Sequence, residues 1–398
     1  MTPFPVFIAG FRPGHRGWFL GIWLILGFTV FTAQAGSKAK PAINQELKNE
    51  GFTHLFETVF TSWDKNHDGK LDLWELNVVI ENPQIHGNES AIAAVLRRRL
   101  QPDEADEGGH KSLSREQVMA MADDPQIQKV ITRHAWHIQA INHALFLTTD
   151  PNLETFHQGG MGDCYLLAVI GAYVYHHPLS VRAMIQPQAN GGFEVHFGNG
   201  RIVPVDPLTD AELLMGAAEG KDHGIWLSVL EKAYARINEE AREMKTGEEI
   251  DADEAVYTDL IGHGGYYGPV ISRLTGHRTS GAPIGKWLKE NPQTGYRKLH
   301  ELLTKLAVEH RLMATGTRGG KPLPKGIAHG HVYAVLSYNP STQLVLMFNP
   351  WGNHVKPANP PGLLNGYLTE HGMFQVPLVD FNELFAGFTY ETDKPVKQ

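Results

Sequence analysis

Cysteine, basic clusters and long apolar runs are all scarce in this sequence. The chain of 398 residues contains one cysteine, Cys164, which excludes an internal disulfide, so the core must be stable without one. The formal net charge is −8, and no block of basic residues alternates with aromatics, which argues against a nucleic-acid partner. With 42% hydrophobic residues the chain can still bury a sizeable core, and we expect a globular protein of two or three domains.

The one long apolar run lies near the N-terminus. Basic residues precede the segment GWFLGIWLILGFTVF, and the small-residue site Ala33-Gln34-Ala35 follows it. This order is typical of a secretory signal peptide, so we expect residues 1–35 to be removed after Ala35 and the protein to be secreted or periplasmic. The alternative is an uncleaved segment that anchors the chain in a membrane, because the run approaches the length of a spanning helix. Only in that case do we expect a membrane partner.

Residues 36–146 are predicted to form an all-helical domain. Apolar residues recur at helical spacing from Phe52 to Trp63, and helical patterns return on both sides of an acidic stretch at residues 101–114. Between the first two helices lies the polar segment DKNHDGKLDLWE. Helix, polar loop and helix is the arrangement of a calcium-binding EF-hand.

This twelve-residue loop places oxygen ligands at the spacing that surrounds one calcium ion. Side-chain oxygens occur at positions 1, 3, 5, 9 and 12, the residue at position 7 contributes its backbone carbonyl, and Gly69 at position 6 permits the turn. The other reading is an acidic, solvated turn without metal. The predicted calcium ligands are Asp64, Asn66, Asp68, Lys70, Asp72 and Glu75.

A second, degenerate loop is expected at Asp106 to Gln117. With Leu113 at position 8, glycine and histidine occupy ligand positions and Gln117 replaces the final glutamate. This loop has too few carboxylates to bind calcium tightly, so we expect it to complete the fold beside the first loop, where Leu71 can pair with it. It can equally be an acidic surface loop.

From residue 147 the pattern changes to a mixture of helices and strands, and we assign residues 147–392 to one domain. The segment FEVHFGNGRIVPV predicts a hairpin that turns at Gly198-Asn199-Gly200. GIWLSVLEKAYARINEEAREM predicts a helix, and HVYAVLSYNPSTQLVLMFNPWG predicts two strands. The fold class is therefore α+β.

Cys164 stands in QGGMGDCYLLAVIGAY, after glycines and at the start of an apolar helical pattern. Thiol chemistry needs the thiolate, and a helix that begins at Cys164 would point its amides and its positive dipole end at the sulfur. Gln158 can supply a side-chain amide that, beside the Cys164 backbone N–H, stabilises an oxyanion. The alternatives are an intermolecular disulfide or a small buried side chain in an ordinary glycine turn.

A base for this thiol is sought among 21 histidines. His331 enters an apolar strand after Gly330, with His329 as its nearest rival on the same face. Asn349, at the end of the next predicted strand, can accept from the imidazole and orient it, and Trp351 can shield that hydrogen bond from water.

Four segments, QGGMGDCYLLA, LSVLEKAYARI, GHVYAV and NPWG, resemble in this order the calpain family of papain-like cysteine proteases. LIGHGGYYGPVISRLTG is similar to a glycine-rich segment of the same family. The resemblance covers about residues 150–390. It implies a papain-like core of two subdomains, with Cys164 as nucleophile, His331 as base, Asn349 as its orienter and Gln158 in the oxyanion hole. Tyr165 is a departure, because the family usually has Trp there.

The expected function is that of a cysteine endopeptidase that acts on protein or peptide substrates and is either regulated or stabilised by calcium. Two alternatives from other classes remain. One is a calcium-binding protein whose protease-like domain binds peptides without cleaving them. The other is an acyl transferase or a transglutaminase-like enzyme with the same Cys–His pair.

Overall fold

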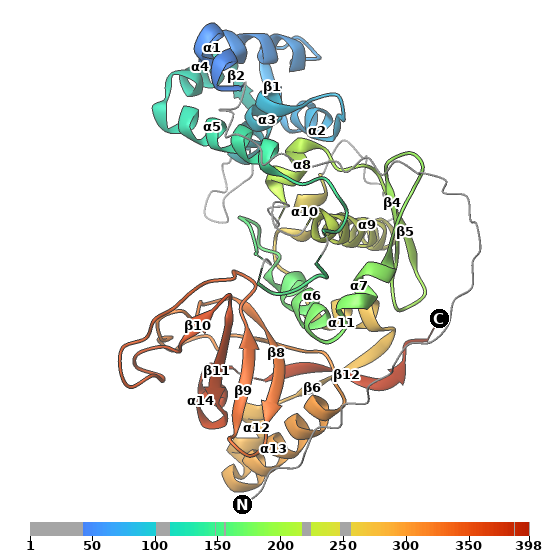
Figure 1. The fold of residues 1–398 in the computed structure, drawn as a ribbon, viewed down its shortest axis with the longest axis vertical. Coiled ribbons are helices and arrows are strands. Elements are labelled where there is room, and N and C mark those ends of the chain that lie inside the picture. The colour runs from blue at the N-terminus through green and yellow to red at the C-terminus, as the bar shows by residue number, and fades with distance from the viewer. Residues whose placement is uncertain are drawn as a thin grey trace, which may run out of the picture. The chain divides into compact units, whose positions relative to one another are not determined.

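The computed structural model (Figure 1) describes residues 43–100, 112–147, 149–154, 157–216, 224–246, 256–385 and 387–397. Helices and antiparallel sheets both occur, in agreement with the expected mixture of the two. The helices are α1 Ile43–Trp63, α2 Leu73–Glu81, α3 Gly87–Arg99, α4 Arg115–Asp123, α5 Pro125–Ala140, α6 Cys164–His176, α7 Pro178–Met184, α8 Asp210–Met215, α9 Trp226–Thr246, α10 Tyr257–Ile261, α11 Tyr267–Thr275, α12 Ile284–Glu290, α13 Pro292–Val308 and α14 Leu378–Leu384. The strands are β1 Lys70–Asp72, β2 Ser112–Ser114, β3 Ile185–Pro187, β4 Phe193–His196, β5 Ile202–Val205, β6 His277–Ala282, β7 Met313–Gly316, β8 Val332–Asn339, β9 Leu344–Phe348, β10 Thr369–Glu370, β11 Met373–Pro377 and β12 Phe388–Pro395.

Helices α1 to α5 share a core to which α1 contributes the apolar stripe seen in the sequence, including the buried Phe56 and Trp63. We expected an all-helical region, but it also contains a two-stranded sheet of β1 and β2, in which Leu71 pairs with Leu113. Residues beyond 146 also join this core, from α8 and at Val256. The packing of the helical region therefore continues past the expected domain boundary.

A second core surrounds α6 and α9. Both helices were expected, and α6 buries almost its whole length because its sequence is apolar on every side. The predicted hairpin is confirmed: β4 and β5 pair antiparallel, with Phe193 opposite Val205, and the turn closes through the Gly200 N–H to the Phe197 carbonyl at 2.9 Å.

A seven-stranded antiparallel sheet in the order β10-β11-β9-β8-β7-β12-β6 forms the third region, with α12, α13 and α14 around it. The two predicted strands are β8 and β9, neighbours in this sheet with Ala334 opposite Phe348. Helix α6 packs against β8 and β9. At Gly171 the approach is so close that a Cβ atom would lie 2.6 Å from the ring of Phe348, which explains a glycine in an otherwise bulky helix.

The predicted signal peptide, residues 1–35, lies outside the described residues. Within the part of the chain that the structure describes, no helix has both the length and the apolar character needed to cross a membrane.

Candidate active site

Cys164 is the first residue of α6 and is half-buried. Its neighbour Asp163 occupies the N-cap position without a capping hydrogen bond from its side chain to the helix. The thiol therefore lies at the end of the helix where free amides and the positive end of the dipole favour a negative charge. This is the position that the sequence pattern predicts.

His331 and Asn349 meet because β8 and β9 are antiparallel neighbours. His331 directly precedes β8 and Asn349 directly follows β9, so both side chains lie at the same end of the strand pair. His331 Nε2 lies 2.8 Å from Asn349 Oδ1, and both residues are buried. His329, the rival histidine, is exposed.

Aromatic rings enclose this imidazole. The ring of Trp351 lies 4.4 Å from that of His331 between centroids, and the edge of Tyr333 faces it at 4.9 Å. The backbone N–H of Trp351 also donates to Asn349 Oδ1 at 3.1 Å. Thr317, which the sequence pattern did not indicate, makes two hydrogen bonds with the backbone of His331. Its backbone N–H donates to the His331 carbonyl, and its Oγ1 accepts from the His331 N–H. The orientation of the imidazole is thus set by its side chain and its main chain together.

The thiol of Cys164 lies beside the backbone of Val332, the residue that follows His331. Burial raises the pKa of Cys164, and a hydrogen bond from the Val332 backbone partly opposes that rise. Burial also lowers the pKa of His331, while its hydrogen bond with Asn349 acts in the opposite direction. Both shifts favour the uncharged thiol and imidazole over the ion pair.

Gln158 is held close to this site by its backbone, whose N–H donates to the carbonyl of Pro350 at 2.7 Å. Its side-chain Nε2 donates to the Met161 carbonyl at 2.6 Å, and no described residue bonds its buried Oε1. One N–H of this amide is therefore engaged with Met161, and the amide has a second N–H with which it can donate to an oxyanion.

Two glycine segments join immediately before the cysteine. Gly162 donates to the Gly262 carbonyl and accepts from the Gly264 N–H, both at 2.9 Å. A Cβ atom at Gly162 would lie 2.4 Å from the Gly262 carbonyl oxygen, so only glycine permits this approach. The turn into α6 is thereby fixed to the segment that follows α10.

Asp163 is a further site residue that sequence reasoning missed, although its place next to the cysteine was a usable signal. It is fully buried, as is Glu231 of α9. Burial raises the pKa of the Asp163 carboxyl to about 6, while the nearby side chains of Glu231 and Gln158 act in the opposite direction. The charge of Asp163 in turn raises the pKa of Cys164, so protonation of this carboxyl favours the thiolate.

The predicted calcium loop follows α1, contains β1 and ends in the first turn of α2. Asp64 Oδ2 accepts from the Gly69 N–H at 3.1 Å, Asn66 Oδ1 from Asp68 at 2.9 Å, and Asp68 Oδ1 from Lys70 at 2.8 Å. Gly69 has a φ of 79°, which glycine adopts without strain. The other oxygen of Asp64 is buried, and no described residue bonds it.

The last two predicted ligands cap α2. Asp72 Oδ1 accepts from the Glu75 N–H, and Glu75 Oε2 accepts from the Asp72 N–H. Glu75 Oε1 accepts from the Lys65 and Asn66 backbones at 2.7 and 3.3 Å. Among the described residues no three His, Cys, Asp or Glu side chains gather closely enough to hold a metal ion, so enclosing calcium requires these carboxylates to turn. The orphaned oxygen of Asp64 and the all-oxygen donor set suit calcium.

The second predicted loop is described only from residue 112, where β2 pairs with β1 through Leu113 opposite Leu71. Ser114 and Gln117 then form a capping box at the start of α4. Gln117 therefore acts as a helix-capping residue, and the first half of the loop lies outside the described residues.

The model of the calpain family of cysteine proteases matches residues 112–357, a span that contains Gln158, Cys164, His331 and Asn349. The chain belongs to the calpain family. Among curated relatives, human calpain-14 is 24% identical over 213 residues, which are 49% of this chain and 27% of that protein. The calpain-type cysteine protease DEK1 of Zea mays is 26% identical over 212 residues, 50% of this chain and 9% of that protein. The calpain-2 catalytic subunit of Bos taurus is 35% identical over 105 residues, 23% of this chain and 15% of that protein.

This calpain spans about a quarter or less of the length of these relatives. Tyr165, at the position where the family usually has Trp, is buried against Gly265. A Cβ atom added at Gly265 would lie 2.5 Å from the ring of Tyr165. Tyr165 also meets Tyr234 edge to face at 6.4 Å. The departure from the family pattern is thus accommodated within the core around α6 and α9.

Proposed function

We propose that this calpain is a cysteine endopeptidase that hydrolyses peptide bonds in proteins. The observation that carries the proposal is the 2.8 Å contact between His331 Nε2 and Asn349 Oδ1, at the end of β8 that adjoins Cys164. Because Nε2 is engaged with Asn349, Nδ1 is the ring nitrogen left to take the proton of the thiol. Nucleophile, base and orienting group are then in the order that covalent catalysis needs.

The reaction begins with transfer of the thiol proton from Cys164 to His331 as Sγ attacks the carbonyl carbon. The oxyanion is stabilised by the Cys164 N–H and by an N–H of the Gln158 amide. The C–N bond then breaks, the amine leaves with the proton from His331, and a thioester remains. Water, deprotonated by His331, attacks the thioester, the S–C bond breaks, and the thiol regains its proton.

The two rival functions predict different products. A peptide-binding protein without activity would bind substrates and release them unchanged, and an acyl transferase would join the acyl group to an added amine. The Asn–His contact and Gln158 favour an enzyme that forms a tetrahedral intermediate over a protein that only binds peptides. Similarity to the calpain family of cysteine proteases favours hydrolysis over acyl transfer.

Casein cleavage by the chain from Gly36, with Cys164→Ala as the matched control, tests the proposal. We expect fragments from the first protein and none from the second. Binding of peptides without any Cys164-dependent cleavage would support the binding protein, and Cys164-dependent incorporation of a fluorescent amine would support the acyl transferase.

We also propose that calcium binds the loop at Asp64, Asn66, Asp68, the Lys70 carbonyl, Asp72 and Glu75. The ion would neutralise the carboxylates and fix the loop in one conformation. The orphaned buried oxygen of Asp64 supports this proposal, because a buried carboxylate oxygen needs a donor or a cation.

Hydrogen bonds connect this loop to the region of Cys164. Asp72 of the loop caps α2, and Asn77 of α2 accepts from Arg97 Nε at 2.6 Å. Arg97 is buried on α3 and pairs with Asp259 of α10. Helix α10 ends at Ile261, directly before the glycine segment that bonds Gly162. We propose that calcium acts along this path and that it regulates activity as well as stability.

A calcium titration with two readouts tests this regulation. In the native chain we expect calcium to raise both the melting temperature and the cleavage rate. In Asp259→Asn, which leaves the loop intact, calcium should still raise the melting temperature while the cleavage rate responds less. A rise in melting temperature with an unchanged cleavage rate in the native chain would leave calcium only a stabilising role.

Export is the last part of the proposal. The signal-like residues 1–35 support it, and Edman sequencing of the protein made in cells is its test. A new N-terminus at Gly36 is expected; an intact N-terminus in the membrane fraction would indicate an anchored protein.

A further inference from the structure

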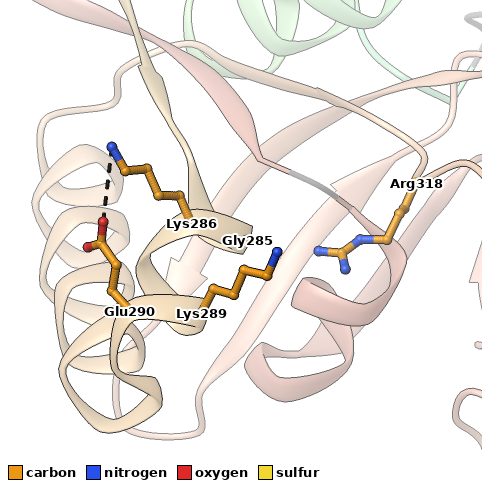
Figure 2. A pocket seen from close by; sticks show the side chains of 5 residues that line it. All are labelled: Gly285, Lys286, Lys289, Glu290 and Arg318. Carbon is orange, nitrogen blue, oxygen red and sulfur yellow. Dashed lines mark ion pairs between the residues drawn. The ribbon is translucent and has the colours of Figure 1, made fainter.

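An open pocket lies between α12 and the segment that follows β7 (Figure 2). Its volume is about 810 Å³, and it is open to solvent, because Lys286, Lys289 and Glu290 are exposed. The lining residues are Gly285, Lys286, Lys289, Glu290 and Arg318. Three of these five residues are cationic, in a chain whose formal net charge is −8.

The three cationic side chains are not equally free to bind an anion. Lys286 faces Glu290, with which it pairs at 4.0 Å. Lys289 and Arg318 extend towards each other from opposite sides of the pocket. Neither has a carboxylate within 4.0 Å among the residues that the structure describes, so these two positive charges have no anionic partner, whereas Lys286 has Glu290.

Arg318 is held in place and yet incompletely bonded. Its backbone N–H donates to the Leu384 carbonyl at 2.8 Å, and its Nη2 reaches the Phe385 carbonyl at 3.5 Å. Its Nε is buried, and within the described ranges no acceptor bonds it. A buried, unpaired N–H of a guanidinium is costly unless a ligand satisfies it.

The acidic side chains of this neighbourhood do not fill this role, because each is paired with a lysine other than Lys289. Glu383 is paired with Lys321 at 2.7 Å, and this pair and the nearby Arg318 together lower its pKa. The protein thus supplies two carboxylates to this neighbourhood, Glu290 and Glu383, and pairs them with Lys286 and Lys321.

We propose that this cavity binds a phosphomonoester, with the phosphate between Lys289 and Arg318. Guanidinium groups match the oxygens of phosphate in a fork, and a doubly charged anion balances two cations. A phosphate alone is much smaller than the cavity, so the ester's organic part would occupy the rest, beside Gly285. The site is independent of the proposed peptidase chemistry.

Isothermal titration of the full chain with O-phospho-L-serine, inorganic phosphate and L-serine tests the site. We expect phosphoserine to bind more tightly than phosphate and serine not to bind. Lys289→Gln and Arg318→Gln should each weaken phosphoserine binding by about tenfold or more, whereas Lys298→Gln, on the exposed side of α13, should leave it unchanged.

Three results would overturn the proposal. The first is no binding of phosphoserine at concentrations up to about 10 mM, where even a millimolar site would be occupied. The second is equal weakening by Lys298→Gln, which would indicate a general charge effect. The third is phosphate binding as tightly as phosphoserine, which would exclude the ester. If Arg318→Gln does not fold, the exposed Lys289→Gln still decides the outcome.

Discussion

Replacing Asn349 by alanine tests the orientation of His331 most directly. The imidazole Nε2–H donates to Asn349 Oδ1 at 2.8 Å in a buried setting, and the ring becomes cationic as it takes the thiol proton. A hydrogen bond to a charged group contributes about 1.5–3 kcal/mol. If that contribution is lost only when the ring is charged, kcat/KM falls about 10- to 150-fold, at 1.4 kcal/mol for each factor of ten.

The pH profile of the same variant supplies a second readout. The hydrogen bond with Asn349 raises the pKa of His331 against the effect of burial, so its removal lowers that pKa further. The base then stays unprotonated to lower pH, and the acidic limb of kcat/KM moves to lower pH. The assay is initial-rate cleavage of fluorescein-labelled casein across the pH range.

Asn353→Ala is the matched control, because it removes the same amide from a half-buried residue that does not contact His331. It should keep its activity within about threefold of the native rate, which is less than half the free energy of about 1.5 kcal/mol expected at minimum for Asn349→Ala. Activity of Asn349→Ala within that same margin, or an equal loss in Asn353→Ala, would refute the orienting role.

Three further changes have defined outcomes. Gly162→Ala places a Cβ atom 2.4 Å from the Gly262 carbonyl oxygen and should lower kcat about 100-fold through a displaced loop, whereas Gly281→Ala, which meets open space, should not; equal activities would contradict this. Trp351→Ala exposes the Asn–His hydrogen bond and should cost about tenfold in kcat/KM at unchanged melting temperature. Burial, with the charges of neighbouring histidines, lowers the pKa of His176 to about 4, so its stabilising effect is complete above pH 6.5 and is lost as the pH falls towards 4. His176→Phe should reduce the decline in the free energy of unfolding over that interval by at most about 1.4 kcal/mol per pH unit, and by less because the ring is only half-buried. An unchanged dependence of that free energy on pH would assign the decline to other groups.

Local patterns in the sequence were sufficient for much of the fold. The 3.6-residue period predicted α9, the glycine turn predicted the β4–β5 hairpin, and the apolar segments around residue 340 predicted β8 and β9. Since antiparallel neighbours bring the start of one strand to the end of the next, the meeting of His331 and Asn349 also followed from the sequence.

Distant pairings were not predictable in this way. Strand β6 lies in the same sheet as β12, more than a hundred residues later, and α8 completes a core formed mostly by α1 to α5. Such contacts depend on the tertiary arrangement, and neither period nor turn chemistry encodes them. The same limit applies to the Gln158 amide, whose hydrogen bond with Met161 is set by a loop conformation, and to the cavity between Lys289 and Arg318.

The junction of the two glycine segments limits how this protein can be redesigned. At Gly162 and Gly262 a side chain would meet a backbone carbonyl oxygen at 2.4 and 2.5 Å, and at Gly265 it would meet the ring of Tyr165. Mutant libraries aimed at new substrate preferences would therefore lose most members that vary these positions, because the turn into α6 would move before any pocket changed. Exposed neighbours such as Tyr266, with 86% of its surface accessible, are the better starting points for laboratory evolution.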